Sequence, residues 1–441
     1  MAIKSRKRRF ASIVAAGLAA ALTLSACGGG TGPTTGPTDG TSTGVSVEPL
    51  ELHLLSHRYA ALEFYAKALA DEAPEGVTVD AELMTYADWQ QKMRINLSSG
   101  SSAYDLTYIF PPDLAEFASN GWLLPLDEYI EKYRDEYNFD DIPKQLWDAY
   151  TYNGHIYGIP SHQWAMIMFS RNDLLQAKGI AVPQTMDEFV DAAKQTTDGT
   201  RFGTALTLKA ADHLALTFQS ILTACGGWWF DDDMKPTFNS PEAICAIDYI
   251  KSLIPYAPDG VTTYGSDEAM IAMAQDKAVL SLQQTTRSAQ MNDPSQSVVV
   301  GKVNFEAPPS VTAGGPRASL FSTAGYSISK FSKADPERAF LTIANATDEE
   351  TMVRGAEAGM PVRQAVLTDE LLASRPDYAA AAAAIASGAR MRPAIPEFNQ
   401  VMEISMRELA KVLAGQAEAQ PAMDQAAAEV EQLLAAAGYY G

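Results

Sequence analysis

Residues 104–113 read YDLTYIFPPD, an apolar run of strand length that ends in two prolines and an acid. Two strand-and-helix units precede this run, with strand or helix periodicity at residues 50–55, 60–70, 76–83 and 88–97. The order strand, helix, strand, helix, strand predicts a parallel α/β sheet. Because ligands bind outside the carboxyl ends of such strands, we expect His57, Arg58 and Asp113 to lie near one ligand-binding edge.

A second sheet is predicted beyond Pro160, which ends a strand at the first crossing between two lobes. Residues 164–169 then read as a buried strand, and Thr185 with Glu188 forms the capping box of a following helix. Further crossings are predicted near residues 302–309 and at Gly359–Arg363. The predicted lobes are residues 48–160 with 306–360, and residues 161–305 with 361–441. Two lobes suit a mature chain of about 400 residues, which exceeds what one hydrophobic core usually organises.

The amino terminus has the pattern of a lipoprotein signal peptide. Five basic residues precede an apolar run, and residues 24–27, LSAC, resemble the lipobox of bacterial lipoproteins. Residues 1–26 are therefore predicted to be removed, and Cys27 to carry a lipid that anchors the chain outside the cytoplasm. Residues 27–47, rich in Gly, Pro and Thr, are predicted to form a flexible tether. The alternative is an ordinary secretory leader with a chance cysteine.

The chain carries a formal charge of −21, and loss of the five basic leader residues makes the mature protein more negative still. Such a field repels nucleic acid and anionic lipid, so neither is expected as a partner. Two cysteines remain beyond Cys27. Cys225 and Cys245 are predicted either to form a disulfide, which persists outside the cell, or to be two separate buried thiols.

Several segments are recognisable together along nearly the whole mature chain, at residues 105–110, 116–127, 152–160, 171–175 and 226–243. In this order and spacing they resemble the extracellular solute-binding proteins of family 1, the carbohydrate-binding subunits of ABC importers, which include maltose-binding protein. The resemblance implies an α/β, type II periplasmic-binding-protein fold, with a mostly parallel sheet flanked by helices in each lobe and ligand in the cleft between them. It also implies a monomer with a carbohydrate ligand and permease subunits as partners, and no cofactor.

The resemblance also implies which loops touch ligand, and Asp113 would accept hydrogen bonds from sugar hydroxyls. The complete set of candidate ligand-binding residues is His57, Arg58, Asp113, His162, Gln163, Trp164, Trp228, Trp229, Gln284, Arg287, Ser322, Thr323 and Arg363. Such residues suit a sugar, because planar polar groups pair with hydroxyls and an indole covers a C–H face. Ser322 and Thr323 stand where relatives commonly have a Gly-Gly-Trp turn. Because this chain has fewer aromatic side chains to stack on sugar rings, the resemblance does not imply the family's usual preference for oligosaccharides.

Structural alternatives stand beside several of these assignments. Trp228 and Trp229 are adjacent and cannot both face the ligand in an extended loop, so one is expected in the core, while Trp164 serves ligand or packing. Arg363 is expected either at the ligand or in an interlobe salt bridge. His53 and His57 lack a third ligand, so no metal site is predicted.

Catalytic patterns are also missing: the sequence has no nucleophile elbow, zinc pattern or phosphate loop. The leading hypothesis is a tethered carbohydrate or polyol receptor of an ABC importer. The alternatives are a receptor of the same fold for another solute, such as a peptide, polyamine or metal chelate, and an exported carbohydrate-active enzyme. A cationic solute would require several acids in the cleft, where the sequence places only Asp113.

Overall fold

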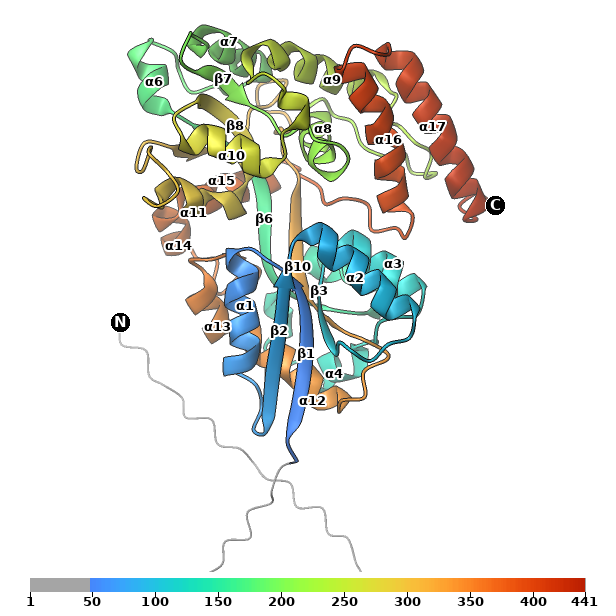
Figure 1. Cartoon of the computed structure of the whole chain (residues 1–441). Helices are drawn as coiled ribbons and strands as arrows, with labels where there is room; N and C mark the ends of the chain where they lie inside the picture. The colour runs from blue at the N-terminus through green and yellow to red at the C-terminus, as the bar shows by residue number, and fades with distance from the viewer. Residues whose placement is uncertain (1–47, 441) are drawn as a thin grey trace, which may run out of the picture. The chain divides into compact units, whose positions relative to one another are not determined.

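One long strand, β6 (Ile159–Ser170), connects both halves of the protein (Figure 1). The computed structural model describes residues 48–440, so the predicted leader, tether and Cys27 lie outside the described residues. Residues 159–165 of β6 pair with β10 (Phe321–Ile328), and residues 166–170 pair with β8 (Ala278–Gln284). The prediction that a strand ends at Pro160 is therefore wrong. The ladder shifts register between Ala324 and Gly325, opposite Pro160, and such an irregularity accommodates a residue that has no N–H to donate.

The N-lobe is built on the strand order β2-β1-β3-β10-β6. β1 (Leu50–His57) pairs in parallel with β2 (Val77–Met84) and with β3 (Leu106–Ile109), as predicted, whereas β10 runs antiparallel to both of its neighbours. The helices of this lobe are α1 (Ala60–Asp71), α2 (Tyr86–Ser98), α3 (Pro111–Ser119), α4 (Asp127–Lys132), α5 (Lys144–Asp148), α12 (Pro336–Ala346) and α13 (Glu349–Gly355).

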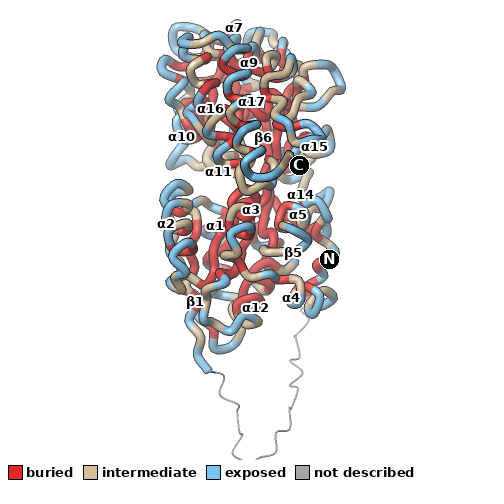
Figure 2. The backbone as a smooth tube through the Cα atoms, turned by 90° about the vertical axis from the view of Figure 1, so that its right-hand side faces the viewer, coloured by how far each residue is buried: buried red, intermediate tan, exposed pale blue. Residues whose placement is uncertain are grey.

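The C-lobe is built on β6, β8, β7 (Phe202–Ala205) and β9 (Asn304–Glu306). Only β7 and β8 are parallel, because β6 runs antiparallel to β8 and to β9, so this sheet is mixed and not mostly parallel. Its helices are α6 (Asn172–Ala177), α7 (Met186–Thr196), α8 (Asp212–Ala224), α9 (Pro241–Leu253), α10 (Ser266–Ala274), α11 (Ser288–Asn292), α15 (Pro376–Ala386), α16 (Phe398–Leu413) and α17 (Ala419–Ala436). Buried residues fill the interior of both lobes (Figure 2).

Local sequence signals explain several helix boundaries. Thr185 accepts a hydrogen bond from the Glu188 backbone while Glu188 bonds back to Thr185, which confirms the predicted capping box of α7. The Ser240 side chain caps α9 just before Pro241. The Cys225 and Cys245 sulfurs form a disulfide, with Cα atoms 6.2 Å apart, that joins the end of α8 to α9.

Two lobe boundaries differ from the predicted ones. Residues after Glu306 stay with the C-lobe, because the Ser310 backbone N–H donates to Gln184 O and the Ser319 hydroxyl to Met166 O. The second crossing therefore runs along β10. Residues 360–361 form β11 beside β6, and Arg363 then bonds within the N-lobe, so the last crossing follows Leu367 and precedes α15. The boundaries were predicted from proline and glycine residues, which mark where a chain bends. In this protein those residues do not coincide with the places where the chain passes from one lobe to the other.

Candidate functional site

The N-lobe presents a cluster of rings at the carboxyl ends of its parallel strands. β1 ends at His57, and Tyr86 begins α2, whose first turn is capped by the Thr85 side chain. The His57 ring centroid lies 5.0 Å from that of Tyr59, 5.6 Å from that of Tyr86 and 6.0 Å from that of Tyr108. Burial lowers the pKa of His57 to about 4, and the charge of Arg287 acts in the same direction. His57 is therefore neutral near pH 7 and offers one hydrogen-bond donor and one acceptor.

The C-lobe supplies charged groups that face this cluster. Asp212, the first residue of α8, accepts hydrogen bonds from the side chain of Arg392, a buried residue on the loop before α16. Burial raises the pKa of the Asp212 carboxyl, but the Arg392 charge and hydrogen bond outweigh it and leave this pKa below its usual value. The Asp212 side chain is still 39% exposed. A second pair, Arg287 with Asp267 at 2.6 Å, lies beyond the end of β8.

The two sets lie close enough for their charges to act on one another. The charges of Asp212, Asp267 and Arg287 all shift the pKa of His57, and those of Asp212 and Arg392 shift the pKa of Tyr86. We call the combined set the interlobe site: His57, Tyr59 and Tyr86 from the N-lobe, and Asp212, Arg287 and Arg392 from the C-lobe. It contains hydroxyl, imidazole, carboxylate and guanidinium groups, which together donate and accept many hydrogen bonds in a small region.

The crossover strand closes one end of this region. The His162 ring is fully buried, with Nε2 2.8 Å from the Tyr59 hydroxyl and Nδ1 3.0 Å from the Ser161 hydroxyl. Burial lowers the pKa of His162 to about 3, so it stays neutral. Gln163 donates to Pro361 O at 2.8 Å, and the Thr323 hydroxyl donates to His162 O at 2.9 Å. Of these three predicted ligand contacts, Gln163 and Thr323 thus bond to neighbouring strands, whereas the His162 ring bonds to Tyr59 of the interlobe site.

Trp164, Ser322 and Gln284 lie in or next to the same crossover strands. Trp164 is 8% exposed and stands opposite Ser322, which is 2% exposed. Gln284, at the end of β8, accepts a hydrogen bond from the Ser266 hydroxyl at 3.3 Å and is only partly buried. Gln284 and Arg287 are thus both partly accessible.

Asp113 is buried and already hydrogen-bonded. Its carboxylate accepts from the Tyr86 hydroxyl at 2.7 Å, from Gln90 Nε2 at 2.7 Å and from Asn399 Nδ2 at 3.3 Å. Burial raises the pKa of Asp113 to about 6, although the bonds from Gln90 and Tyr86 oppose this shift. The acceptor capacity predicted for sugar hydroxyls is therefore used within the protein, and Asp113 acts on the interlobe site through Tyr86.

Three other predicted contacts lie away from the site. Arg58 is exposed and donates to Leu83 O at 2.9 Å, beside β2 on the outer side of α1. Trp229 is fully buried, donates to Gln219 Oε1 at 2.9 Å and packs against aromatic rings of the C-lobe core. Arg363 is fully buried and donates to Thr347 O and Asn138 O, both in the N-lobe, and within residues 48–440 it forms no salt bridge between the lobes. These three assignments are corrected.

Trp228 has a different environment from Trp229. It is half-buried, and the guanidinium carbon of Arg390 lies 3.9 Å from its ring centroid. This stacking covers one face of Trp228, the more accessible of the two indoles in the aromatic loop.

Sequence reasoning missed four residues of the interlobe site, namely Tyr59, Tyr86, Asp212 and Arg392, and it also missed Arg390 beside Trp228. Tyr59 and Tyr86 had a usable signal, because each follows the end of a predicted strand. Arg392 had none, since it lies 180 residues from Asp212 on a loop without periodicity.

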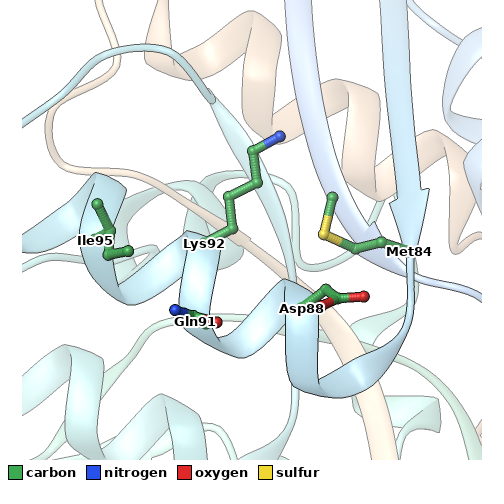
Figure 3. A pocket seen from close by; sticks show the side chains of 5 residues that line it. All are labelled: Met84, Asp88, Gln91, Lys92 and Ile95. Carbon is green, nitrogen blue, oxygen red and sulfur yellow. The ribbon is translucent and has the colours of Figure 1, made fainter.

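A hollow of about 390 Å³ lies elsewhere, on the outer surface of α2 (Figure 3). Its lining residues are Met84, Asp88, Gln91, Lys92 and Ile95, and none of them belongs to the interlobe site. Within residues 48–440, no three His, Cys, Asp or Glu side chains are grouped so that they would hold a metal ion. No helix in that range combines the length and apolar character needed to cross a membrane.

Comparison with known families matches residues 56–353 to the bacterial extracellular solute-binding proteins, and the chain belongs to this family. A mannitol-binding protein of Pseudomonas aeruginosa is 27% identical over 301 residues, which cover 65% of this chain and 67% of that protein. A solute-binding protein of Agrobacterium radiobacter, solved with ribitol, is 25% identical with a TM-score of 0.78, covering 88% of this chain and 99% of that one. A maltose-bound protein of T. maritima is 24% identical with a TM-score of 0.78, covering 87% and 100%.

These similarities confirm the predicted family and the two-lobed α/β fold. The chain is accordingly a solute-binding receptor of an ABC transporter and not an enzyme.

Proposed function

We propose that the chain captures a small polyhydroxylated solute, an acyclic polyol or a monosaccharide, at the interlobe site. The observation that carries this proposal is the make-up of the site. Hydrogen-bonding groups converge from both lobes, while Trp229 lies in the core and Arg390 covers a face of Trp228. Oligosaccharides are usually held by a row of aromatic plates, which this arrangement does not favour.

Relatives support this choice of solute. Similar proteins include binding proteins for mannitol and for erythritol and L-threitol, and a solute-binding protein solved with ribitol. The interlobe site also balances its charges, because Asp212 pairs with Arg392 and Asp267 with Arg287. A neutral solute fits such a site better than a cationic amine or an anion.

The proposal extends to the context of the receptor. The two lobes close on the solute about β6, β10 and the last crossing, and the closed form delivers it to membrane permease subunits. Cys27 carries the lipid anchor, and the receptor acts as a monomer on the outer side of the membrane. Radiolabelled palmitate incorporation that disappears in a Cys27→Ala variant is the expected result for the anchor, and unchanged incorporation would contradict it.

Thermal melts of the purified protein test the solute class. A solute that binds only the folded state adds about 2.7 kcal/mol of stability at a hundredfold excess over its Kd. We expect ribitol, mannitol or a monosaccharide to raise the Tm and to be recovered chemically unchanged. A shift only with oligosaccharides, or only with amines or peptides, would refute the proposed solute class, and consumption of the solute would refute a receptor.

A further inference from the structure

Asn399 forms a direct hydrogen-bonded contact between the lobes. It is the second residue of α16, and its Nδ2 lies 3.3 Å from Asp113 Oδ1 and 3.3 Å from Glu116 Oε2, both on α3. One amide group of the C-lobe therefore donates to two carboxylates of the N-lobe. Carboxylates are strong acceptors, and the amino-terminal end of a helix favours negative charge nearby.

Both sides of this contact are held firmly. Phe398, next to Asn399, is fully buried with its ring centroid 5.1 Å from that of Trp229 in the C-lobe core. Glu397 accepts a hydrogen bond from the Tyr439 hydroxyl at 2.9 Å. On the N-lobe side, Arg94 holds Glu116 through two hydrogen bonds of 2.7 and 2.6 Å. The contact thus joins rigid parts of the two lobes.

The same carboxylate connects this contact with the interlobe site. Asp113 accepts from the Tyr86 hydroxyl at 2.7 Å, and the Tyr86 ring lies against His57. A movement that separates Asn399 from Asp113 would also separate Tyr86 from Asp212 and Arg392 of the other lobe, because each group is fixed to its own lobe.

We propose that Asn399 with Asp113 and Glu116 forms an interlobe clasp, which stabilises the closed arrangement and strengthens solute binding without touching the solute. Asn399 is accordingly a positioning residue. The effect on affinity rests on the proposed function, whereas the effect on lobe opening does not. The clasp can shift the equilibrium between the open and closed forms only by the difference in free energy that its hydrogen bonds contribute to the two forms.

Lobe opening is measured without any solute, by pulsed electron paramagnetic resonance between two nitroxide labels. Ile95→Cys on α2 and Glu403→Cys on α16 place the labels at exposed positions on either side of the clasp, in a Cys27→Ala background that keeps the disulfide. We expect Asn399→Ala to shift the distances toward longer values. Asn399→Asp should shift them further, because a third carboxylate then faces Asp113 and Glu116.

Gln400→Ala is the matched control, since Gln400 is the next residue of α16, is exposed and makes no side-chain hydrogen bond among the described residues. Its distances should equal those of the parent. Unchanged distances in both Asn399 variants would overturn the clasp.

Affinity gives the second readout. We expect Asn399→Ala to raise the Kd for the best polyol about fivefold, as the loss of one net hydrogen-bonding contact implies. A failure of the parent protein to bind any polyol would refute the proposed function while the distance measurement still decides on the clasp. An unchanged Kd in Asn399→Ala, with the parent binding normally, would refute its role in affinity.

Discussion

Replacing Asp212 by asparagine probes the solute site with the smallest change in shape. The Asp212 side chain is 39% exposed and faces His57 and Tyr86 across the lobes, so its carboxylate is placed to accept from a solute hydroxyl. A hydrogen bond to a charged group contributes about 1.5–3 kcal/mol, which corresponds to roughly a ten- to hundredfold change in Kd. Because asparagine keeps one carbonyl oxygen, we expect an increase in Kd near the lower end of this range.

The same substitution has a calculable effect on stability. Arg392 is 3% exposed and would lose its charged partner, which costs about 3–5 kcal/mol for a fully buried pair. Since Asp212 is partly exposed and Arg392 also donates to Asp212 O at 3.2 Å, we expect a smaller loss of about 1–2 kcal/mol.

Isothermal titration calorimetry and urea unfolding measure both quantities. Asp248→Asn is the matched control, because it removes one charge from an exposed position of α9 in the same lobe. The control should bind like the parent protein. If Asp212→Asn also binds like the parent while remaining folded, Asp212 lies outside the solute site and the reasoning fails.

Three further predictions concern stability. Reduction of the Cys225–Cys245 disulfide, which spans a sequence separation of 20, should lower the free energy of unfolding by about 3 kcal/mol through loop entropy, and an unchanged Tm in reductant would contradict this. Trp229→Ala should cost about 3–5 kcal/mol in urea unfolding because it empties a core position, and a loss below that of Trp228→Ala would show the assignment to be wrong. Since the pKa of His162 is lowered to about 3, the unfolded state takes up a proton below pH 6.5 that the folded state does not, and stability falls as pH drops. A His162→Gln variant should show a pH slope shallower by up to about 1.4 kcal/mol per unit between pH 6 and 4, whereas equal slopes would refute a buried neutral imidazole.

Much of the fold was predictable because local signals agree with the tertiary arrangement. α9 and α12 each begin with a capping side chain followed by proline, a start signal that the sequence shows directly. The continuity of β6 was not predictable. A proline normally ends a strand, and only the register shift in the partner strand β10 accommodates Pro160.

The candidate site was predictable only in part, for a related reason. The place of His57 in the site was predictable because the residue lies at the end of a parallel strand. The different environments of Trp228 and Trp229 were predictable because adjacent side chains in an extended loop point in different directions. The pairing of Asp212 with Arg392 depends on a loop that returns from the carboxyl-terminal part of the chain. Hydrophobic periodicity carries no information about such a contact, so it emerges only from the packed structure.

A crystal structure of the protein with its tightest-binding polyol tests the central claim most directly. We predict that the polyol lies between the lobes, with a hydroxyl within hydrogen-bond distance of Asp212 and another within reach of His57 or Tyr86. A polyol that contacts only one lobe, or that occupies the outer hollow lined by Met84 and Ile95, would contradict the account.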